Sequence, residues 1–209
     1  MDFDGTLVES NNIKDRAFET IFSEWPEHTE SIFQWHLAHD AIERREKFRY
    51  FVEEVLGLSD RNDLIENLTS RFGQLTKTAI IECAFVKGAE EFLEFTRNKV
   101  AVYLISTTPQ FELNKIIEER KLGKFFKRVF GAPFKKIETL QNIMLLERVS
   151  IKEILFIGDS PQDQQSAKYL SIGFIGRQSD RKLVDNYGNI FTDFIGMKHY
   201  IKIKYELYR

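Results

Sequence analysis

The sequence predicts an α/β protein whose core is a Rossmann-like, doubly wound parallel sheet carrying an inserted all-helical domain. From Phe85 onward, short apolar runs alternate with segments of helical spacing, the order of strands and helices in a parallel sheet. From residue 11 to 84, apolar residues recur at helical spacing and no strand-like run interrupts them. We therefore assign residues 1–10 and 85–209 to the core and residues 11–84 to the helical insert.

The insert is expected to hold three amphipathic helices. Their apolar residues recur three or four positions apart, so each helix has one face to bury. The first helix carries Ile13, Ala17, Phe18, Ile21 and Phe22; the second Phe48, Phe51, Val52, Val55 and Leu56; the third Leu64, Leu68 and Phe72.

The core is expected to hold several short buried strands, each followed by a helix. The strands are predicted at residues 100–105, 128–130, 154–157 and 172–175, with a further one at 190–191. Thr108 and Pro109 resemble a helix cap and first helical residue, and Ser160, Pro161 and Asp163 make a stronger helix start. Residues 197–209 are expected to form a mixed-charge amphipathic helix.

Composition narrows the class of protein. The chain has 209 residues, is 43% hydrophobic and carries a net charge of −2, which argues against a nucleic-acid surface. No apolar run reaches the length of about 18 residues that a membrane span needs. The single cysteine, Cys83, excludes an intramolecular disulfide and fits a reducing compartment, so a cytoplasmic protein is expected.

Polar residues follow three of the predicted strands and also lie at a strand end expected at the start of the chain, at Asp2. Because ligands of such sheets bind at the carboxyl ends of the strands, these side chains should converge. They are Asp2 and Asp4, Ser106, Lys135 and Lys136 after the Gly131 turn, and Asp159 with Asp163. Two nearby carboxylates can hold a divalent cation such as Mg2+, or divide the work of nucleophile and acid/base. Each residue alone has an ordinary explanation, as a turn, a surface lysine or a helix cap, but four coincidences at successive strand ends are much less expected.

The run Asp2-Phe3-Asp4-Gly5-Thr6 resembles the first motif of the haloacid dehalogenase superfamily. Ser106 matches the second motif, and Lys136 the third, with Lys135 as the alternative. Gly158-Asp159-Ser160-Pro161-Gln162-Asp163 matches the fourth motif in full. The helical insert is similar, more loosely, to the cap domain of phosphoglycolate phosphatase-like and β-phosphoglucomutase-like members.

The resemblance implies a Mg2+-dependent phosphatase that acts on a small phosphorylated metabolite. Asp2 would attack phosphorus and form an aspartyl phosphate, while Asp4 would protonate the leaving oxygen and later activate water. Asp4 also argues against the dehalogenase branch, whose members lack this second aspartate. A monomer or weak dimer is expected.

The resemblance also implies the binding residues of the site. Mg2+ would be held by the Asp2 carboxylate, the Asp4 backbone carbonyl and Asp159, with Asp163 close behind. Ser106, Thr107 and Lys136 would bind the phosphoryl oxygens, with Lys135 again the alternative to Lys136.

Two other functions stay open. A phosphomutase would use the same residues but protect the aspartyl phosphate from water. A catalytically silent binding module on the same fold is the third reading, although it need not keep both Asp2 and Asp4.

In the insert, Arg44 and Lys47 lie three residues apart, so one helix face could present both to a substrate. A solvated surface is the ordinary alternative for either residue. His36 and His39 are also three apart, but no third ligand is evident, so we interpret them as structural or solvent-facing.

The start of the chain raises a further expectation. Only Met1 stands before Asp2, whereas a central strand needs about five residues. We therefore expect several more residues before Met1 in the native chain, or else poor folding, with a free amino group beside the nucleophile.

Overall fold

The computed structural model describes residues 1–39, 42–179, 183 and 187–205. The chain divides into two compact units, one formed by Met1–Glu9 and Cys83–Arg209 and the other by Ser10–Glu82. We call them the core unit and the helical unit. None of the helices described is long and apolar enough to cross a membrane.

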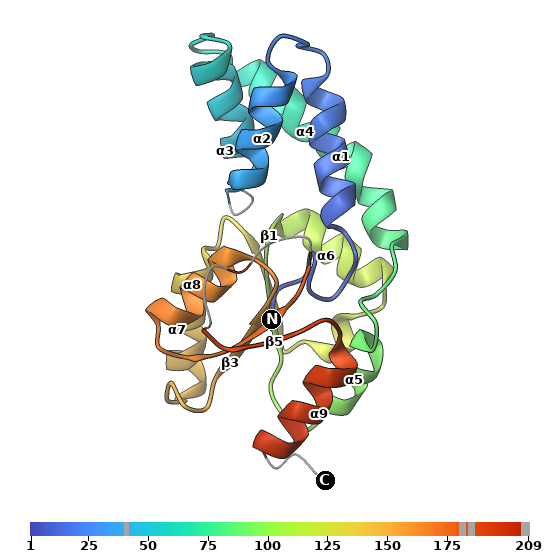
Figure 1. Cartoon of the computed structure of the whole chain (residues 1–209), viewed down its shortest axis with the longest axis vertical. Coiled ribbons are helices and arrows are strands. Elements are labelled where there is room, and N and C mark those ends of the chain that lie inside the picture. The colour runs from blue at the N-terminus through green and yellow to red at the C-terminus, as the bar shows by residue number, and fades with distance from the viewer. Residues whose placement is uncertain (40–41, 180–182, 184–186, 206–209) are drawn as a thin grey trace. The chain divides into compact units, whose positions relative to one another are not determined.

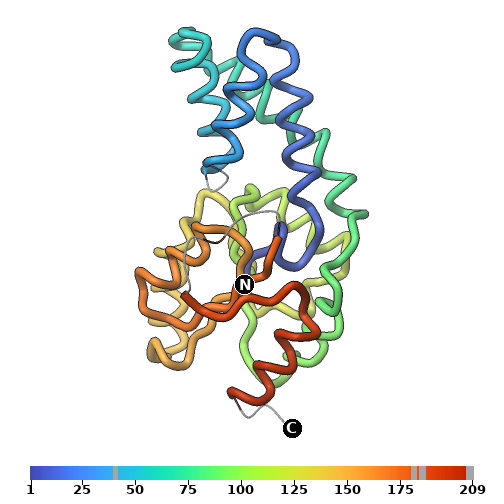
Figure 2. Tube along the Cα trace, in the orientation of Figure 1, coloured from blue at the N-terminus to red at the C-terminus, as the bar shows by residue number. Residues whose placement is uncertain are grey.

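The helical unit contains helices only, among its described residues. They are α1 (Asn11–Phe22), α2 (Thr29–Ala38), α3 (Arg44–Tyr50), a π-helical turn η1 (Phe51–Val55) and α4 (Asn62–Glu82). Helix α4 runs alongside α1 (Figure 2) and also contacts α3.

Aromatic rings fill the interior of the helical unit. The ring of Phe18 on α1 lies 4.4 Å from that of Phe72 on α4 and 5.3 Å from that of Phe48 on α3. Phe22 and Phe51 are also fully buried and pack 5.0 Å apart. The apolar positions that recur along the sequence thus meet in one core of their own.

The core unit alternates strands and helices along the chain (Figure 1). Its elements are α5 (Ala89–Thr96), β1 (Tyr103–Pro109), α6 (Gln110–Glu119), a 3₁₀ turn η2 (Gly123–Phe125), β2 (Arg128–Ala132), α7 (Lys136–Glu147), β3 (Leu155–Gly158), α8 (Pro161–Tyr169), β4 (Gly173–Arg177), β5 (Asn189–Phe191) and α9 (Phe194–Lys204). The strand pairs β1–β2, β3–β4 and β4–β5 are all parallel. The predicted fold class is confirmed.

The N-terminal residues join the two groups of strands. Strands β1 and β2 form one ladder, and β3, β4 and β5 another. The Met1 amino group donates to Tyr103 O at 2.7 Å, and Ile105 N donates to Met1 O at 2.9 Å. On the other side, Asp2 N donates to Ile157 O at 2.8 Å. Met1 and Asp2 therefore lie between β1 and β3, and we call this junction the seam.

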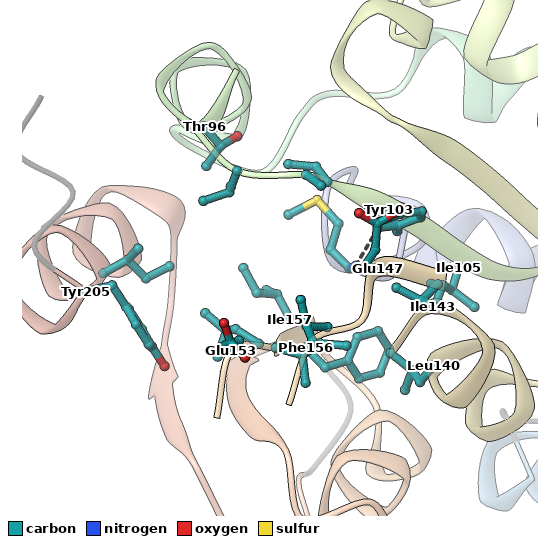
Figure 3. A pocket seen from close by; sticks show the side chains of 18 of the residues that line it. Thr96, Tyr103, Ile105, Leu140, Ile143, Glu147, Glu153, Phe156, Ile157 and Tyr205 are labelled. Atoms are coloured by element: carbon teal, nitrogen blue, oxygen red, sulfur yellow. Dashed lines mark hydrogen bonds between the residues drawn. The ribbon is translucent and has the colours of Figure 1, made fainter. Parts of the chain in front are cut away.

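A cavity of about 430 Å3 lies next to the seam (Figure 3). Its walls include Met1, Tyr103 and Ile105 from one side and Phe156 and Ile157 from the other. Most of the lining is apolar. The Tyr103 hydroxyl donates to the Glu147 carboxylate at its edge. The seam thus joins β1 at Tyr103 and Ile105 to β3 at Ile157, and the cavity lies beside it.

Two predicted boundaries are wrong. Strand β1 continues through Thr108 to Pro109, and α6 begins at Gln110, so Thr108 is not the helix cap. The C-terminal helix begins at Phe194 rather than Met197, because the Asp193 carboxylate accepts hydrogen bonds from Ile195 N and Gly196 N. Residues 206–209, part of the predicted tail helix, lie outside the described residues.

Candidate active site

The start of helix α8 fixes two acidic side chains at the end of β3. Ser160 and Asp163 form a capping box at the start of the helix. Asp163 Oδ2 accepts hydrogen bonds from Ser160 N at 3.2 Å and from Ser160 Oγ at 2.6 Å. At Gly158, a Cβ atom would stand 2.4 Å from Asp163 Cβ, so a side chain there would collide with this carboxylate. The tight turn therefore requires glycine and points Asp163 inward, where it is fully buried.

Three carboxylates converge at this point. One oxygen each of Asp2, Asp159 and Asp163 lies within 4.8 Å of the others, and all three residues are buried. The Thr6 hydroxyl donates to Asp159 Oδ1 at 3.1 Å and orients it. Three buried anionic oxygen donors suit a hard divalent cation, because their mutual repulsion is costly without a positive partner.

Lys136 supplies one positive partner. Its Nζ lies 2.6 Å from Asp163 Oδ1 and 3.3 Å from Asp2 Oδ1. Burial alone would lower the pKa of Lys136, but the carboxylates of Asp163 and Asp2 raise it above its ordinary value. The ammonium therefore stays charged and bridges two of the three acids. Lys135, in contrast, is 78% exposed and lies 3.9 Å from Glu138, away from this cluster.

The Asp2 carboxyl group has a perturbed environment. Burial raises its pKa well above the usual value, Lys136 opposes this, and the neighbouring carboxylates of Asp163, Asp159 and Asp4 add to the rise. A strongly shifted carboxyl group at the ends of strands is a feature of functional sites.

Asp4 is held by a separate pair of hydroxyl groups. Ser106 Oγ donates to Asp4 Oδ2 at 3.2 Å, and Thr108 Oγ1 donates to the same oxygen at 3.1 Å. The Asp4 side chain is not part of the three-carboxylate cluster. The structure thus gives Asp2 and Asp4 different surroundings. Asp2 lies among carboxylates and an ammonium group, whereas Asp4 accepts hydrogen bonds from two hydroxyl groups.

Three residues near the site were missed by the sequence interpretation: Thr6, Thr108 and Arg177. Arg177, at the end of β4, donates to Gly5 O at 3.1 Å and to Glu9 Oε1 at 2.5 Å, so it braces the turn that follows Asp4. Thr107 was predicted to bind phosphate, yet it is half-buried and no side-chain hydrogen bond of it occurs among the described residues. Alternation along β1 turns it away from the face of Ser106 and Thr108.

The predicted substrate-binding pair of the helical unit is not presented on one exposed face. Lys47 is only 2% exposed, and its Nζ lies 2.8 Å from His36 Nδ1. His36 Nε2 in turn lies 3.0 Å from Asp15 Oδ1. The Arg44 guanidinium lies 5.3 Å from the ring centroid of Phe72. For Lys47 the expectation of an accessible side chain is wrong, because its ammonium group contacts buried His36, which in turn contacts the half-buried Asp15.

The two histidines of the helical unit have different surroundings. His36 is buried within the chain of contacts just described. His39 is exposed; its Nδ1 contacts Trp35 O at 2.8 Å and its ring stacks on Trp35. The described residues place neither of them in a cluster suited to a metal ion.

Comparison with known proteins identifies the family. Residues 1–176 match the family model described as haloacid dehalogenase-like hydrolase. The chain belongs to this family. The resemblance predicted from the four motifs is therefore confirmed, and the parallel sheet with its convergent strand ends is the family's fold.

Individual relatives are similar over different lengths. A phosphoglycolate phosphatase of Pseudomonas syringae pv. tomato is 28% identical over 188 residues, which cover 83% of this chain and 66% of that protein. The curated relatives are matched over 35% to 66% of their own lengths.

Solved structures show the same fold at low identity. A Thermotoga maritima protein described as a β-phosphoglucomutase has a TM-score of 0.68 at 19% identity, covering 97% of both chains. The Bacillus subtilis hydrolase YfnB, solved with magnesium bound, has a TM-score of 0.67 at 14% identity, covering 96% of both chains.

Proposed function

We propose that this protein is a Mg2+-dependent phosphatase that hydrolyses a small phosphorylated metabolite through a phosphorylated Asp2. The observation that carries the proposal is the division between two aspartates two residues apart. Asp2 lies among carboxylates and an ammonium group, and Asp4 accepts hydrogen bonds from two hydroxyl groups. Such separate environments suit two different chemical roles.

In this mechanism an Asp2 carboxylate oxygen attacks phosphorus, the P–O bond to the leaving group breaks, and the leaving oxygen takes its proton from Asp4. Water then attacks the phosphorylated Asp2 while Asp4 accepts the water's proton, which restores both residues. Lys136, 3.3 Å from Asp2, neutralises charge that develops on the phosphoryl oxygens.

The donor set fits the metal ion. Asp2, Asp159 and Asp163 offer buried carboxylate oxygens, the ligands that Mg2+ prefers. When bound, the ion would polarise the phosphoryl group and offset the negative charge of the cluster. The Asp4 backbone carbonyl would be a further ligand, as the resemblance to the family implies. The residues of the helical unit would choose the substrate, in the role of a cap.

The relatives support a first candidate for the substrate. Several curated relatives are phosphoglycolate phosphatases, so phosphoglycolate is the first candidate for this chain. The test is phosphate release from a panel of phosphorylated metabolites that includes phosphoglycolate and hexose phosphates. We expect release that requires Mg2+ and stops when a chelator is added.

A pair of matched substitutions tests the nucleophile. Asp2→Asn keeps the shape of the side chain but removes the nucleophilic oxygen, so turnover should fall by at least about 10³-fold. Asp193→Asn is the control. Residue 193 is the N-cap of helix α9 and lies outside the site, and asparagine can replace aspartate as an N-cap. Near-normal turnover by pure Asp2→Asn protein contradicts the mechanism. Isomerised sugar phosphate without phosphate release identifies a mutase. If the protein catalyses neither hydrolysis nor isomerisation, it is a silent binding module.

A further inference from the structure

Thr108 is the least expected residue of the site. Its Thr-Pro sequence is typical of a helix start, yet its hydroxyl group does not cap α6, whose N-cap is Pro109. Instead Thr108 is 6% exposed and donates to Asp4 Oδ2 at 3.1 Å. A buried threonine hydroxyl at a strand end, bonded to a carboxylate 104 residues away, has a role that local structure does not explain.

The hydrogen-bond directions around Asp4 are fixed. Ser106 Oγ accepts a hydrogen bond from Thr108 N at 3.1 Å, and donates its own proton to Asp4. Oδ2 accepts hydrogen bonds both when the carboxyl group is ionised and when its proton is on Oδ1, so both hydroxyl groups donate to it in either state. In the ionised state the two hydrogen bonds are charge-assisted.

The backbone at Thr108 is fixed as well. The pairing of β1 with β2 is irregular between Ile105 and Pro109, where the strand carries Ser106 and Thr108 on one face. Strand β2 approaches so closely that a Cβ atom on Gly131 would stand 2.5 Å from Thr108 O. Gly131 N also donates to Gln110 Oε1 at 2.7 Å. The hydroxyl group is thus presented from a rigid position.

We propose that Thr108 is a positioning residue for proton transfer: together with Ser106 it holds Asp4 Oδ2, so that Asp4 Oδ1 is the atom that exchanges the proton. The inference rests on the proposed phosphatase function. A carboxylate oxygen has about two acceptor positions, and the two hydroxyl groups take both on Oδ2. The two bonds also oppose rotation of the carboxylate about its Cβ–Cγ bond, so Oδ1 keeps one orientation.

The substrate's leaving group provides the test. An alkoxide such as the one from phosphoglycolate needs a proton as it leaves, whereas p-nitrophenolate does not. We compare Thr108→Val, which keeps the shape and removes the hydroxyl group, with Thr108→Ser, which restores it. Thr96→Val is the control, because Thr96 is a buried threonine whose hydroxyl group bonds only to carbonyl groups of its own helix, α5.

For Thr108→Val, kcat/KM on phosphoglycolate should fall about 10- to 100-fold, and on p-nitrophenyl phosphate less than about threefold. Thr108→Ser should recover most of the loss, and Thr96→Val should match the wild type on both substrates. Equal losses on both substrates, or no loss, would overturn the proposal, because a phosphate-binding or purely structural role does not depend on the leaving group.

A crystal structure of Thr108→Val decides the positioning role even if the protein hydrolyses neither ester. The Asp4 carboxylate should turn away from its wild-type place in Thr108→Val and keep it in Thr108→Ser. An unmoved carboxylate in Thr108→Val overturns the inference. Failure of the proposed function is recognised separately, by wild-type protein that releases no phosphate from any ester.

Discussion

Lys136 is the residue on which the electrostatics of the site depend. Its ammonium group is the positive partner of Asp163 and Asp2, and all three side chains are buried. Removing one member of a buried ion pair leaves the other charge uncompensated in the interior. The resulting loss of stability is larger than the net stabilisation that the ion pair provides.

We expect Lys136→Met to lower the free energy of unfolding by about 3–5 kcal/mol in the absence of Mg2+. The loss should shrink when Mg2+ is added, because the ion would supply positive charge to the same carboxylates. Urea unfolding with and without Mg2+ measures both effects. Lys135→Met, at a position 78% exposed, is the control and should unfold like the wild type. An unchanged Lys136→Met midpoint would show that the carboxylates are not held by this charge.

Within the helical unit, the contacts of helices α1, α2 and α3 meet at Lys47. An ammonium group can only donate, so His36 Nδ1 accepts from Lys47 and the proton of His36 lies on Nε2, facing Asp15. The Lys47 ammonium also lies 5.2 Å from the ring centroid of Phe18. Three helices are thus linked by one polar chain inside an aromatic core.

Lys47→Ala should therefore destabilise the protein by about 3 kcal/mol or more, with little change in KM. Arg49→Ala is the control on the same helix, because Arg49 makes an exposed ion pair with Glu46 that contributes less than about 1 kcal/mol. Thermal unfolding and substrate kinetics of both variants measure the effects. A stable Lys47→Ala protein with a raised KM would return Lys47 to the role of substrate contact.

Residues at strand ends could be predicted from the sequence, whereas polar contacts between different elements could not. Ser106 and Asp159 could be predicted because apolar runs of strand type precede them in the sequence, and the carboxyl ends of parallel strands meet at one edge. Asp2 could be predicted from its motif, although the part of the chain that the structure describes has no strand before it. Thr108 was misread because threonine before proline is also typical of a helix start. The burial of Lys47 could not be predicted, since its partner His36 lies 11 residues away on another helix. Local pattern reveals strand ends, whereas polar contacts between elements appear only in three dimensions.

In a chain that is expressed from Met1, the buried amino group of Met1 makes the free energy of unfolding depend on pH. Burial lowers its pKa to about 5, from 8.0 in an exposed amino terminus. Between these values the unfolded chain holds a proton that the folded chain releases. As far as this group is concerned, the free energy of unfolding is therefore highest above pH 8 and decreases progressively as the pH falls toward 5.

N-terminal acetylation tests this contribution. An acetylated Met1 has no titrating amine but keeps an N–H group for Tyr103 O. We expect the unmodified protein to lose up to about 1.4 kcal/mol of stability per pH unit relative to the acetylated protein between pH 8 and pH 6. Urea unfolding of both forms across this range gives the difference, which also cancels the titration of Asp2 and its neighbours. Parallel curves for the two forms would contradict the assignment.

The seam also has a consequence for the order of events during synthesis. Met1 and Asp2 are synthesised well before their partners, because the hydrogen-bond partner of Met1 at Tyr103 comes 102 residues later, and that of Asp2 at Ile157 later still. At about 5–20 residues per second, many seconds pass between the synthesis of Met1 and Asp2 and that of both partners. Asp2 and its acidic neighbours Asp159 and Asp163 can therefore assemble only when most of the core unit has been made. A nascent chain that stops before β3 cannot possess this chemistry.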